Sequence, residues 1–314
     1  MLRYRQNRIV ESRLTLPVVA VATLILWCVV LCFKDFALEE VLPKLGILSL
    51  STYLMMLLNN ENALIRIYSR MVSCMFLLIS TSAIFNIISL RAALCQLGFI
   101  IMISLLFKSY QDRSSTGLTF YAFLCLGLIS MVYIKVLYLV PFLWVMMITF
   151  LMSFSIGTIS ASVLGVLTPY WFVGCIALVM QDSTWFEEHF AQIFTFSADI
   201  SELSVNEVIL FTVLFVFGVL GAIHFILYNY QDKIRTRLFY YLLIELSVLI
   251  GVMTLLQPCD SEFLLPMLIV TVSPLIAHFV SLTHSRLSNI TFHLLILAVL
   301  FCIVFNLWTP SLTF

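Results

Sequence analysis

Three carboxylates follow the first apolar run of the chain, and carboxylates in such a place could serve as general bases. Asp35, Glu39 and Glu40 come directly after the apolar range 14–33. Phe36 is three and four residues before Glu39 and Glu40, and this spacing predicts a short amphipathic helix that lies flat on the membrane, apolar side down. A partly buried carboxylate there could accept a proton from a hydroxyl or an amide. The alternative is a solvated turn in which neighbouring lysines screen the acids.

Two isolated cations are candidates for holding a phosphate. Lys135 is the only charged residue between the apolar ranges 117–134 and 136–152, and Arg91 lies in a turn with few other polar residues. A lysine that faces a cavity can bind a phosphate or pyrophosphate as a point charge. The alternative for both residues is a side chain that reaches outward to the lipid headgroups.

Four titratable residues lie inside apolar ranges and suggest a proton relay. Glu245 is about eight residues inside the range 238–257, and His224, His278 and His293 lie at comparable depth in three other ranges. Histidine titrates near neutral pH, and burial moves carboxyl groups toward the same range. The alternative is a neutral Glu245 that is hydrogen-bonded within the bundle, with each histidine facing the headgroups independently.

A polar turn occurs twice, as Tyr110-Gln111-Asp112-Arg113 and as Tyr230-Gln231-Asp232-Lys233. Asp at such a position can accept hydrogen bonds from the free amides of a helix start, so we interpret both turns as helix caps. With five residues inserted in the second copy, matching the turns also aligns Pro141 with Pro266, which suggests a parallel internal repeat with units 108–160 and 228–285. Chance similarity between two apolar segments is the alternative.

The composition decides which elements position these residues. The chain has 314 residues, of which 62% are hydrophobic and only 10% charged, with a mean hydropathy of +1.12. Soluble domains carry about 25% charged residues, so the sequence predicts an all-α, polytopic transmembrane bundle in a single domain, 1–314. Zero net charge and the absence of a basic run argue against nucleic acid as a partner. The sequence has no phosphate-loop or zinc-hydrolase motif, and we expect no cofactor and no metal.

Eleven apolar ranges are candidate spans, of which 46–58 is short and could be extended backward by the amphipathic segment 36–45. They are 14–33, 46–58, 71–90, 92–107, 117–134, 136–152, 162–180, 207–228, 238–257, 263–280 and 290–308. With the N-terminus inside, twelve of the sixteen basic residues fall on the inner side and most acids fall outside. The positive-inside rule therefore predicts an inside N-terminus and an outside C-terminus. The acidic segment 181–206 would be an outer connector with its aromatic residues at the membrane interface, or a lid over an outward-facing site.

Two family resemblances accompany this pattern. The segment 238–280, the stretch from Gly127 to Pro141 and the Gly165–Tyr170 pattern resemble a Bacteroidetes-type family of multi-spanning inner-membrane proteins with no assigned activity. More remotely, GLISMVYIKVLYLVPFLW resembles a stretch of the C-type glycosyltransferases, membrane enzymes that use polyprenyl-phosphate sugars. That second resemblance implies Asp35 as the catalytic acid, although the loop lacks the usual Asp-Glu pair and no soluble domain follows the last span. A non-catalytic relative is therefore also expected.

These observations give one leading hypothesis and two alternatives. The leading one is an inner (plasma) membrane protein of the cell envelope that handles a lipid-linked sugar at its outer face. Asp35 would be its base, supported by Glu39 or Glu40, and Lys135 and Arg91 would hold the donor phosphate. The alternatives are a transporter or flippase that uses Glu245 and the histidines, and a non-enzymatic assembly subunit. Its partners would be membrane lipid, polyprenyl-phosphate-linked sugar and other envelope proteins.

Overall fold

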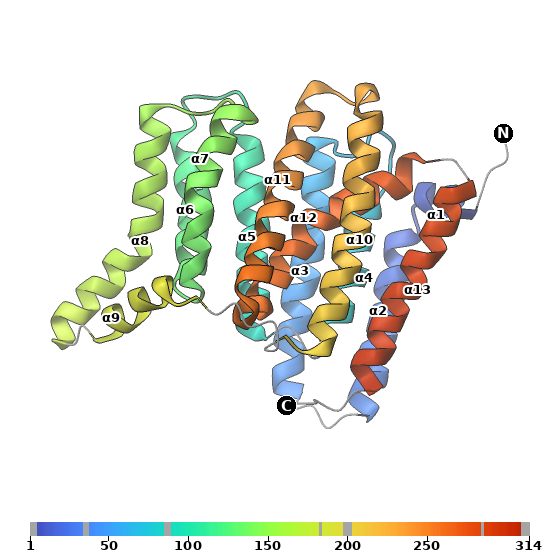
Figure 1. The fold of residues 1–314 in the computed structure, drawn as a ribbon, viewed down its shortest axis with the longest axis horizontal. Coiled ribbons are helices and arrows are strands. Elements are labelled where there is room, and N and C mark those ends of the chain that lie inside the picture. The colour runs from blue at the N-terminus through green and yellow to red at the C-terminus, as the bar shows by residue number, and fades with distance from the viewer. Residues whose placement is uncertain are drawn as a thin grey trace. The chain divides into compact units, whose positions relative to one another are not determined.

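The structure, a computed structural model, describes residues 5–33, 38–84, 89–181, 184–196, 203–283 and 286–308. Within these ranges every regular element is a helix (Figure 1). An all-helical chain is what a lipid environment requires, because a helix satisfies its backbone hydrogen bonds internally. Contacts divide the chain into two compact units, 1–93 with 198–314 (unit 1) and 94–197 (unit 2), and the boundary falls in the first turn of α5.

Each of the eleven predicted ranges overlaps an observed helix. In the part of the chain that the structure describes, seven helical segments are long and apolar enough to cross a membrane: Val41–Asn62, Leu90–Lys108, Ile156–Met180, Val205–Gln231, Ile234–Leu256, Pro258–Leu282 and Ser288–Phe305. Four further apolar helices are shorter: Thr15–Val29, Met71–Ala83, Thr116–Ser130 and Ile134–Thr149. The all-helical class is therefore confirmed, and the seven segments are compatible with a multi-pass membrane protein. The count of eleven spans and the orientation stay predictions.

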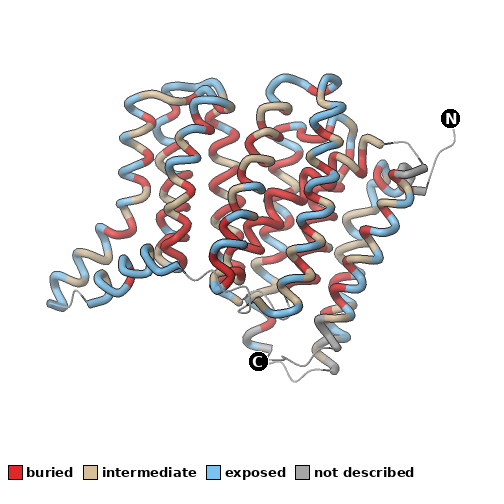
Figure 2. The backbone as a smooth tube through the Cα atoms, in the orientation of Figure 1, coloured by how far each residue is buried: buried red, intermediate tan, exposed pale blue. Residues whose placement is uncertain are grey.

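Unit 1 is built around one buried helix. Its elements are α1 (Arg5–Glu11), α2 (Thr15–Phe33), α3 (Leu38–Asn62), α4 (Met71–Ile84), α10 (Val205–Tyr228), η4 (Asn229–Gln231), α11 (Ile234–Leu256), η5 (Pro258–Asp260), α12 (Ser261–Leu282) and α13 (Arg286–Trp308). Helix α12 packs against α4, α10 and α11, and nearly all of its residues are buried (Figure 2). Helices α2, α3 and α13 pack against α4, so α4 and α12 together form the core of the unit.

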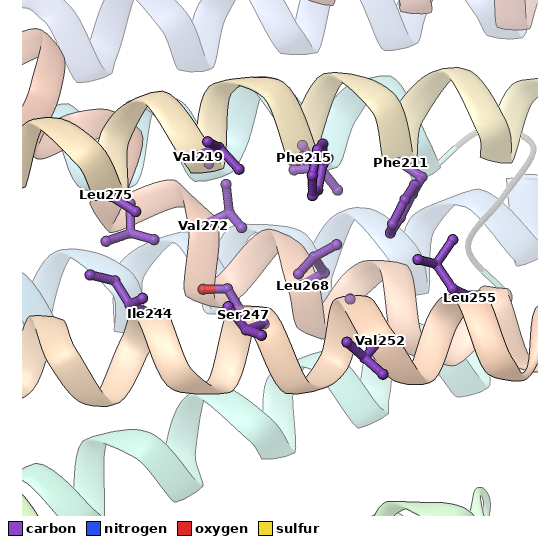
Figure 3. Close-up of a pocket in the computed structure, with 15 residues that line it drawn as sticks. Phe211, Phe215, Val219, Ile244, Ser247, Val252, Leu255, Leu268, Val272 and Leu275 are labelled. Atoms are coloured by element: carbon purple, nitrogen blue, oxygen red, sulfur yellow. The ribbon is translucent and has the colours of Figure 1, made fainter.

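Small residues allow α10 to approach α12 closely. A Cβ atom added to Gly221 would lie 2.7 Å from the carbonyl oxygen of Leu275, so only glycine fits at this position. Beside this contact, α10, α11 and α12 enclose an apolar cavity of about 160 Å³ (Figure 3). Ser247 is its one polar lining residue, and the Ser247 hydroxyl donates to the carbonyl of Leu243. The cavity therefore offers no group for chemistry.

Unit 2 pairs α6 with α8. Its elements are α5 (Leu90–Lys108), α6 (Thr116–Ser130), η1 (Ile134–Tyr138), α7 (Leu139–Thr149), α8 (Ile156–Met180), α9 (Thr184–Ala191) and η2 (Gln192–Phe194). Gly127 and Gly165 lie at the crossing of α6 and α8, which is the small-residue packing common between membrane helices. Pro141 lies in the first turn of α7, where its missing amide hydrogen costs nothing. Helix α6 ends at Ser130, and Lys135 lies in η1, between α6 and α7.

Replacing Gly165 with alanine should destabilise unit 2. The added Cβ would lie 2.5 Å from the carbonyl oxygen of Phe120 and 2.9 Å from the amide nitrogen of Leu124, and backbone atoms cannot move aside. We expect a cost of about 1–3 kcal/mol, as for other overpacked interiors. Gly117→Ala is the matched control, because nothing lies within 4 Å of its added Cβ. Thermal unfolding of the purified variants in detergent measures both, and equal midpoints would contradict the described packing.

Candidate functional site

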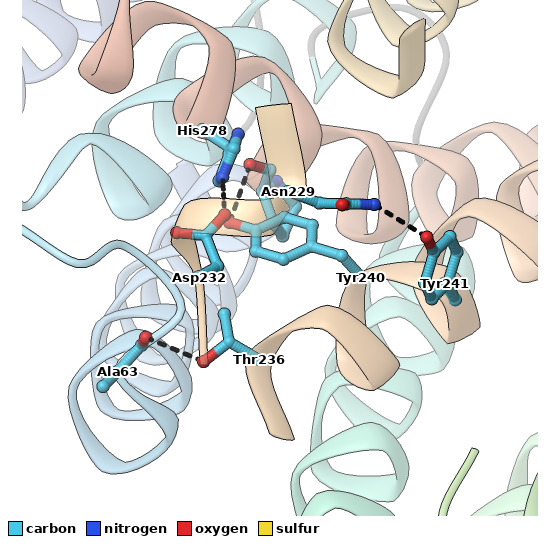
Figure 4. A network of polar contacts seen from close by, with 8 residues as sticks. Ala63, Asn229, Asp232, Thr236, Tyr240, Tyr241 and His278 are labelled. Atoms are coloured by element: carbon cyan, nitrogen blue, oxygen red, sulfur yellow. Dashed lines mark hydrogen bonds and ion pairs between the residues drawn. The ribbon is translucent and has the colours of Figure 1, made fainter. Parts of the chain in front are cut away.

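A buried, hydrogen-bonded pair of a histidine and an aspartate lies at the end of unit 1 where α10 and α12 finish and α11 begins. His278 Nε2 lies 3.0 Å from Asp232 Oδ2, and the two side chains are only 1% and 2% exposed (Figure 4). His278 comes four residues before the end of α12. Asp232 is in the short link between η4 and α11. Its backbone is extended, and its amide donates a hydrogen bond to the carbonyl of Asn229.

Hydrogen bonds hold this link against its neighbours. Asn229 Nδ2 donates to the Tyr241 hydroxyl at 2.7 Å, which connects the link to α11 (Figure 4). The Thr236 hydroxyl donates to the carbonyl of Ala63 at 3.4 Å. Arg235 donates to the side-chain oxygen of Asn62 at 2.9 Å. The last two bonds bring the segment between α3 and α4 to the same end of the unit.

Aromatic rings surround His278 on its other sides. Its ring centroid lies 4.8 Å from that of Tyr240, 5.3 Å from that of Phe225 and 5.7 Å from that of His224. His224 in turn stacks on Tyr228, with centroids 4.9 Å apart. Two histidines and one carboxylate therefore lie together in a mostly apolar environment, which raises the energetic cost of any unpaired charge there.

Several polar atoms of this cluster lack hydrogen-bond partners. Among the described residues, Asp232 Oδ1, His278 Nδ1 and His224 Nδ1 are buried and unpaired, and so is Arg237 Nε in the second turn of α11. An unsatisfied buried polar atom costs about 1–3 kcal/mol, and such atoms are rare away from functional sites. Four other side chains in the described part of unit 1, Ser51, Asn59, Ser73 and Ser281, also have a buried, unpaired oxygen, but none of them is titratable or charged. The titratable or charged groups with unpaired atoms all lie near the ends of α10 and α12 or at the start of α11, which marks this end of unit 1 as the candidate site.

The cluster borders a pocket of about 460 Å³. Its lining residues come from the α3–α4 segment, α10, η4, α12 and α13. They are Arg66, His224, Tyr228, Gln231, His278, Phe279, Leu282, Thr283, Ser288 and Thr291. The lining combines the guanidinium group of Arg66, the imidazoles of His224 and His278, and hydroxyl and amide groups. Such a lining can bind a polar ligand and exchange a proton with it.

The structure brings together two of the four residues predicted for a proton relay. His224 and His278 are neighbours, and both line the pocket. Glu245 is half-buried on α11 and does not line it. His293 is exposed on α13, where its Nδ1 lies 2.6 Å from the carbonyl oxygen of Asn289. Asp232, which the sequence predicts as a helix cap, is the carboxylate that His278 contacts.

The turn sequences explain why Asp232 was missed. In the first turn, Asp112 Oδ1 accepts hydrogen bonds from the amide and the hydroxyl of Ser114, and these bonds lower the pKa of the Asp112 carboxyl. In the second turn the residue two positions after Asp232 is Ile234, which has no hydroxyl. Asp232 makes no capping bond to α11 and is directed toward His278 instead. The missing serine was the signal in the sequence.

The residues predicted for sugar transfer are only partly described. Asp35 lies outside the described residues, and Glu39 and Glu40 lie in the first turn of α3, with Glu39 exposed. Arg91 is exposed at the start of α5, in unit 1. Lys135 belongs to unit 2 and is only 8% exposed. The predicted catalytic site therefore stays a prediction.

Part of the acidic segment 181–206 forms a helix that docks within unit 2. His189 on α9 donates from Nε2 to the carbonyl of Ser130 at 3.0 Å, directly at the end of α6. The hydroxyl of Tyr170 on α8 donates to the hydroxyl oxygen of Ser130 at 2.8 Å. Trp185 stacks on His189 with ring centroids 4.4 Å apart, whereas Phe194 in η2 is 81% exposed. The docking of α9 depends on His189, which was not among the site residues predicted from the sequence.

Comparison with protein-family models, with curated proteins and with solved structures finds no match for this chain, so its function has to be inferred from its own residues.

Acidification should loosen the docking of α9. Burial lowers the pKa of His189 below its usual value of about 6.5, and the hydrogen bond to Ser130 opposes this by less. The undocked histidine then binds a proton more readily than the docked one, so docking is strongest above about pH 6.5 and weakens below it. Hydrogen exchange of 184–196 should rise relative to intrinsic rates between about pH 7 and about pH 5.

His189→Gln provides the control for this pH effect. Glutamine keeps a donor for the Ser130 carbonyl but cannot be protonated in this range. Its exchange should therefore change little with pH. An equal rise in the variant, or no rise in the natural chain, would show that His189 does not govern the docking of α9.

Proposed function

We propose that this chain is a multi-pass membrane carrier, of the transporter or flippase kind, whose proton-binding group is the cluster of Asp232, His278 and His224. The observation that carries the proposal is the hydrogen bond between His278 and Asp232, buried at the polar end of a helical bundle beside a pocket. The inner membrane, the inside N-terminus and the eleven spans predicted from the sequence belong to this proposal.

The cost of burying charge supports a functional role for the cluster. Ionisable residues within membrane helices are expensive and are mostly found on ion or substrate pathways. A carboxylate and an imidazole that share a hydrogen bond hold or release a proton together, because the charge of each depends on the other. The imidazole of His224 lies 5.7 Å away between ring centroids, and its Nδ1 has no hydrogen-bond partner among the described residues.

The charges around the pocket favour the cytoplasmic side. Arg66 lines the pocket, Arg70 follows in the same segment, and Lys233, Arg235 and Arg237 follow Asp232 at the start of α11. Cytoplasmic ends of membrane helices are enriched in lysine and arginine. A proton site at this end would exchange with the cytoplasm when the pocket is open, as alternating access requires.

The glycosyltransferase-like and assembly-subunit hypotheses remain as second proposals. Lys135 is buried in η1, between α6 and α7, and this burial favours a role for it beyond contact with headgroups. If the chain transfers a lipid-linked sugar, Asp35→Asn and Lys135→Ala should each alter envelope glycans in cells that depend on the protein. Unchanged glycans in both variants would leave the carrier, or a subunit that co-purifies with another envelope protein.

Uptake driven by a pH gradient should depend on Asp232 and His278. Proteoliposomes with the purified chain would be given a mixture of small polar metabolites under an imposed pH gradient, and mass spectrometry would identify what accumulates inside. We expect accumulation of at least one solute to fall more than about tenfold in Asp232→Asn and in His278→Gln.

His293→Gln is the matched control, since it alters an exposed histidine of the same unit that does not line the pocket. It should transport like the natural chain. Transport that persists in Asp232→Asn, or that shows no response to the pH gradient, would exclude the proposed carrier mechanism.

A further inference from the structure

We infer that the pocket beside His278 binds an oxyanion of the phosphate type, either free or as the headgroup of a lipid, and that a proton enters with it. This inference rests on the proposed function and names the class of its substrate. It starts from Arg66, which lines the pocket and is exposed to it. The planar guanidinium group offers paired donors that match the oxygen atoms of a phosphate.

The start of α13 adds a second attraction for an anion. Ser288 and Thr291, the third and sixth residues of this helix, line the pocket. The first amides of a helix carry partial positive charge and are a common location for phosphate groups. The hydroxyls themselves are already donated, from Ser288 to Gln6 Oε1 and from Thr291 to the carbonyl of Ser288. The attraction from α13 is therefore that of its backbone amides.

The buried imidazole of His278 is the independent sign of a ligand. The residue is completely buried, it lines the pocket, and its Nδ1 has no hydrogen-bond partner among the described residues. When Asp232 is ionised, the Nε2 hydrogen is donated to it, so Nδ1 of the neutral ring has no hydrogen to offer. Binding a proton turns Nδ1 into a donor for an oxyanion.

The balance of charge explains why a proton is needed. The titratable and charged groups around His278 come from the elements packed against it: Arg66 from the α3–α4 segment, His224 and Tyr228 from α10, Asp232 from the link, and Tyr240 from α11. Asp232 offsets Arg66, and the last turns of α10 and α12 place partial negative charge at this end. Protonation of His278 makes the pocket net positive, and anion binding then becomes favourable.

Inorganic phosphate is the first probe. Calorimetry on the full chain in a neutral detergent should show phosphate binding that is at least about tenfold tighter at about pH 6 than at about pH 8. Arg66→Gln should weaken binding by about tenfold or more. Arg70→Gln removes the same charge from the same segment outside the pocket and should change the affinity less than about twofold. In His278→Gln the pH dependence should disappear.

The second probe separates a lipid headgroup from a free anion. Nanodiscs of phosphatidylcholine with phosphatidic acid would be compared with discs of phosphatidylcholine alone, and the lipids retained on purification counted by mass spectrometry. Retention of phosphatidic acid that depends on Arg66 but not on Arg70, without binding of inorganic phosphate, assigns the pocket to a headgroup. Binding of inorganic phosphate with the same dependence assigns it to a free anion.

The inference is overturned if neither probe binds, or if Arg66→Gln and Arg70→Gln behave alike. Uptake driven by a pH gradient that still requires Asp232 would then leave the carrier proposal intact, with a ligand of another class. Size-exclusion profiles that match the natural chain establish that each variant is folded before it is compared, and Arg66→Lys, which keeps the charge but not the paired donors, should show an intermediate affinity.

Discussion

The burial of α12 is the constraint on which unit 1 depends. This helix is covered by α4, α10 and α11, so almost every side chain that it carries must be apolar or hydrogen-bonded. His278 is a titratable residue buried near its end, and Asp232 supplies the hydrogen bond that offsets the cost of this burial. The short link between α10 and α11 places Asp232 there, and the bonds of Arg235 and Thr236 to the α3–α4 segment bring Arg66 to the same end.

Close backbone contacts set the rest of the packing in both units. Gly221 brings α10 against α12 in unit 1, and Gly127 and Gly165 bring α6 against α8 in unit 2. Lipid provides little hydrophobic driving force between helices, so such close contacts and polar bonds hold a membrane bundle together. In unit 2, α6 ends at Ser130, and the carbonyl of Ser130 accepts a hydrogen bond from His189. Each unit thus combines small-residue packing with a buried histidine that forms a hydrogen bond near a helix end.

The helices could be predicted from the sequence because a membrane span is a local signal of about twenty apolar residues. Asp112 could be predicted as a turn residue for the same reason, since its partner Ser114 is two residues away. The site could not, because Asp232 and His278 are 46 residues apart and are joined by the packing of α10 and α11 on α12. Depth along a span pointed correctly to His224 and His278, but it does not say which face of a helix a residue occupies. Glu245 and His293 share that depth and lie outside the pocket lining.

A double-mutant cycle between Asp232 and His278 tests the central claim most directly. The unfolding free energies of Asp232→Asn, His278→Gln and the double variant would be measured in one detergent at one pH. Removing one partner of a buried pair leaves the other unpaired, so each single change should be costly. The double variant should then lose about 0.5–3 kcal/mol less than the sum of the two single changes. Losses that simply add would mean that the two side chains do not interact, and the proton site built on their contact would not exist.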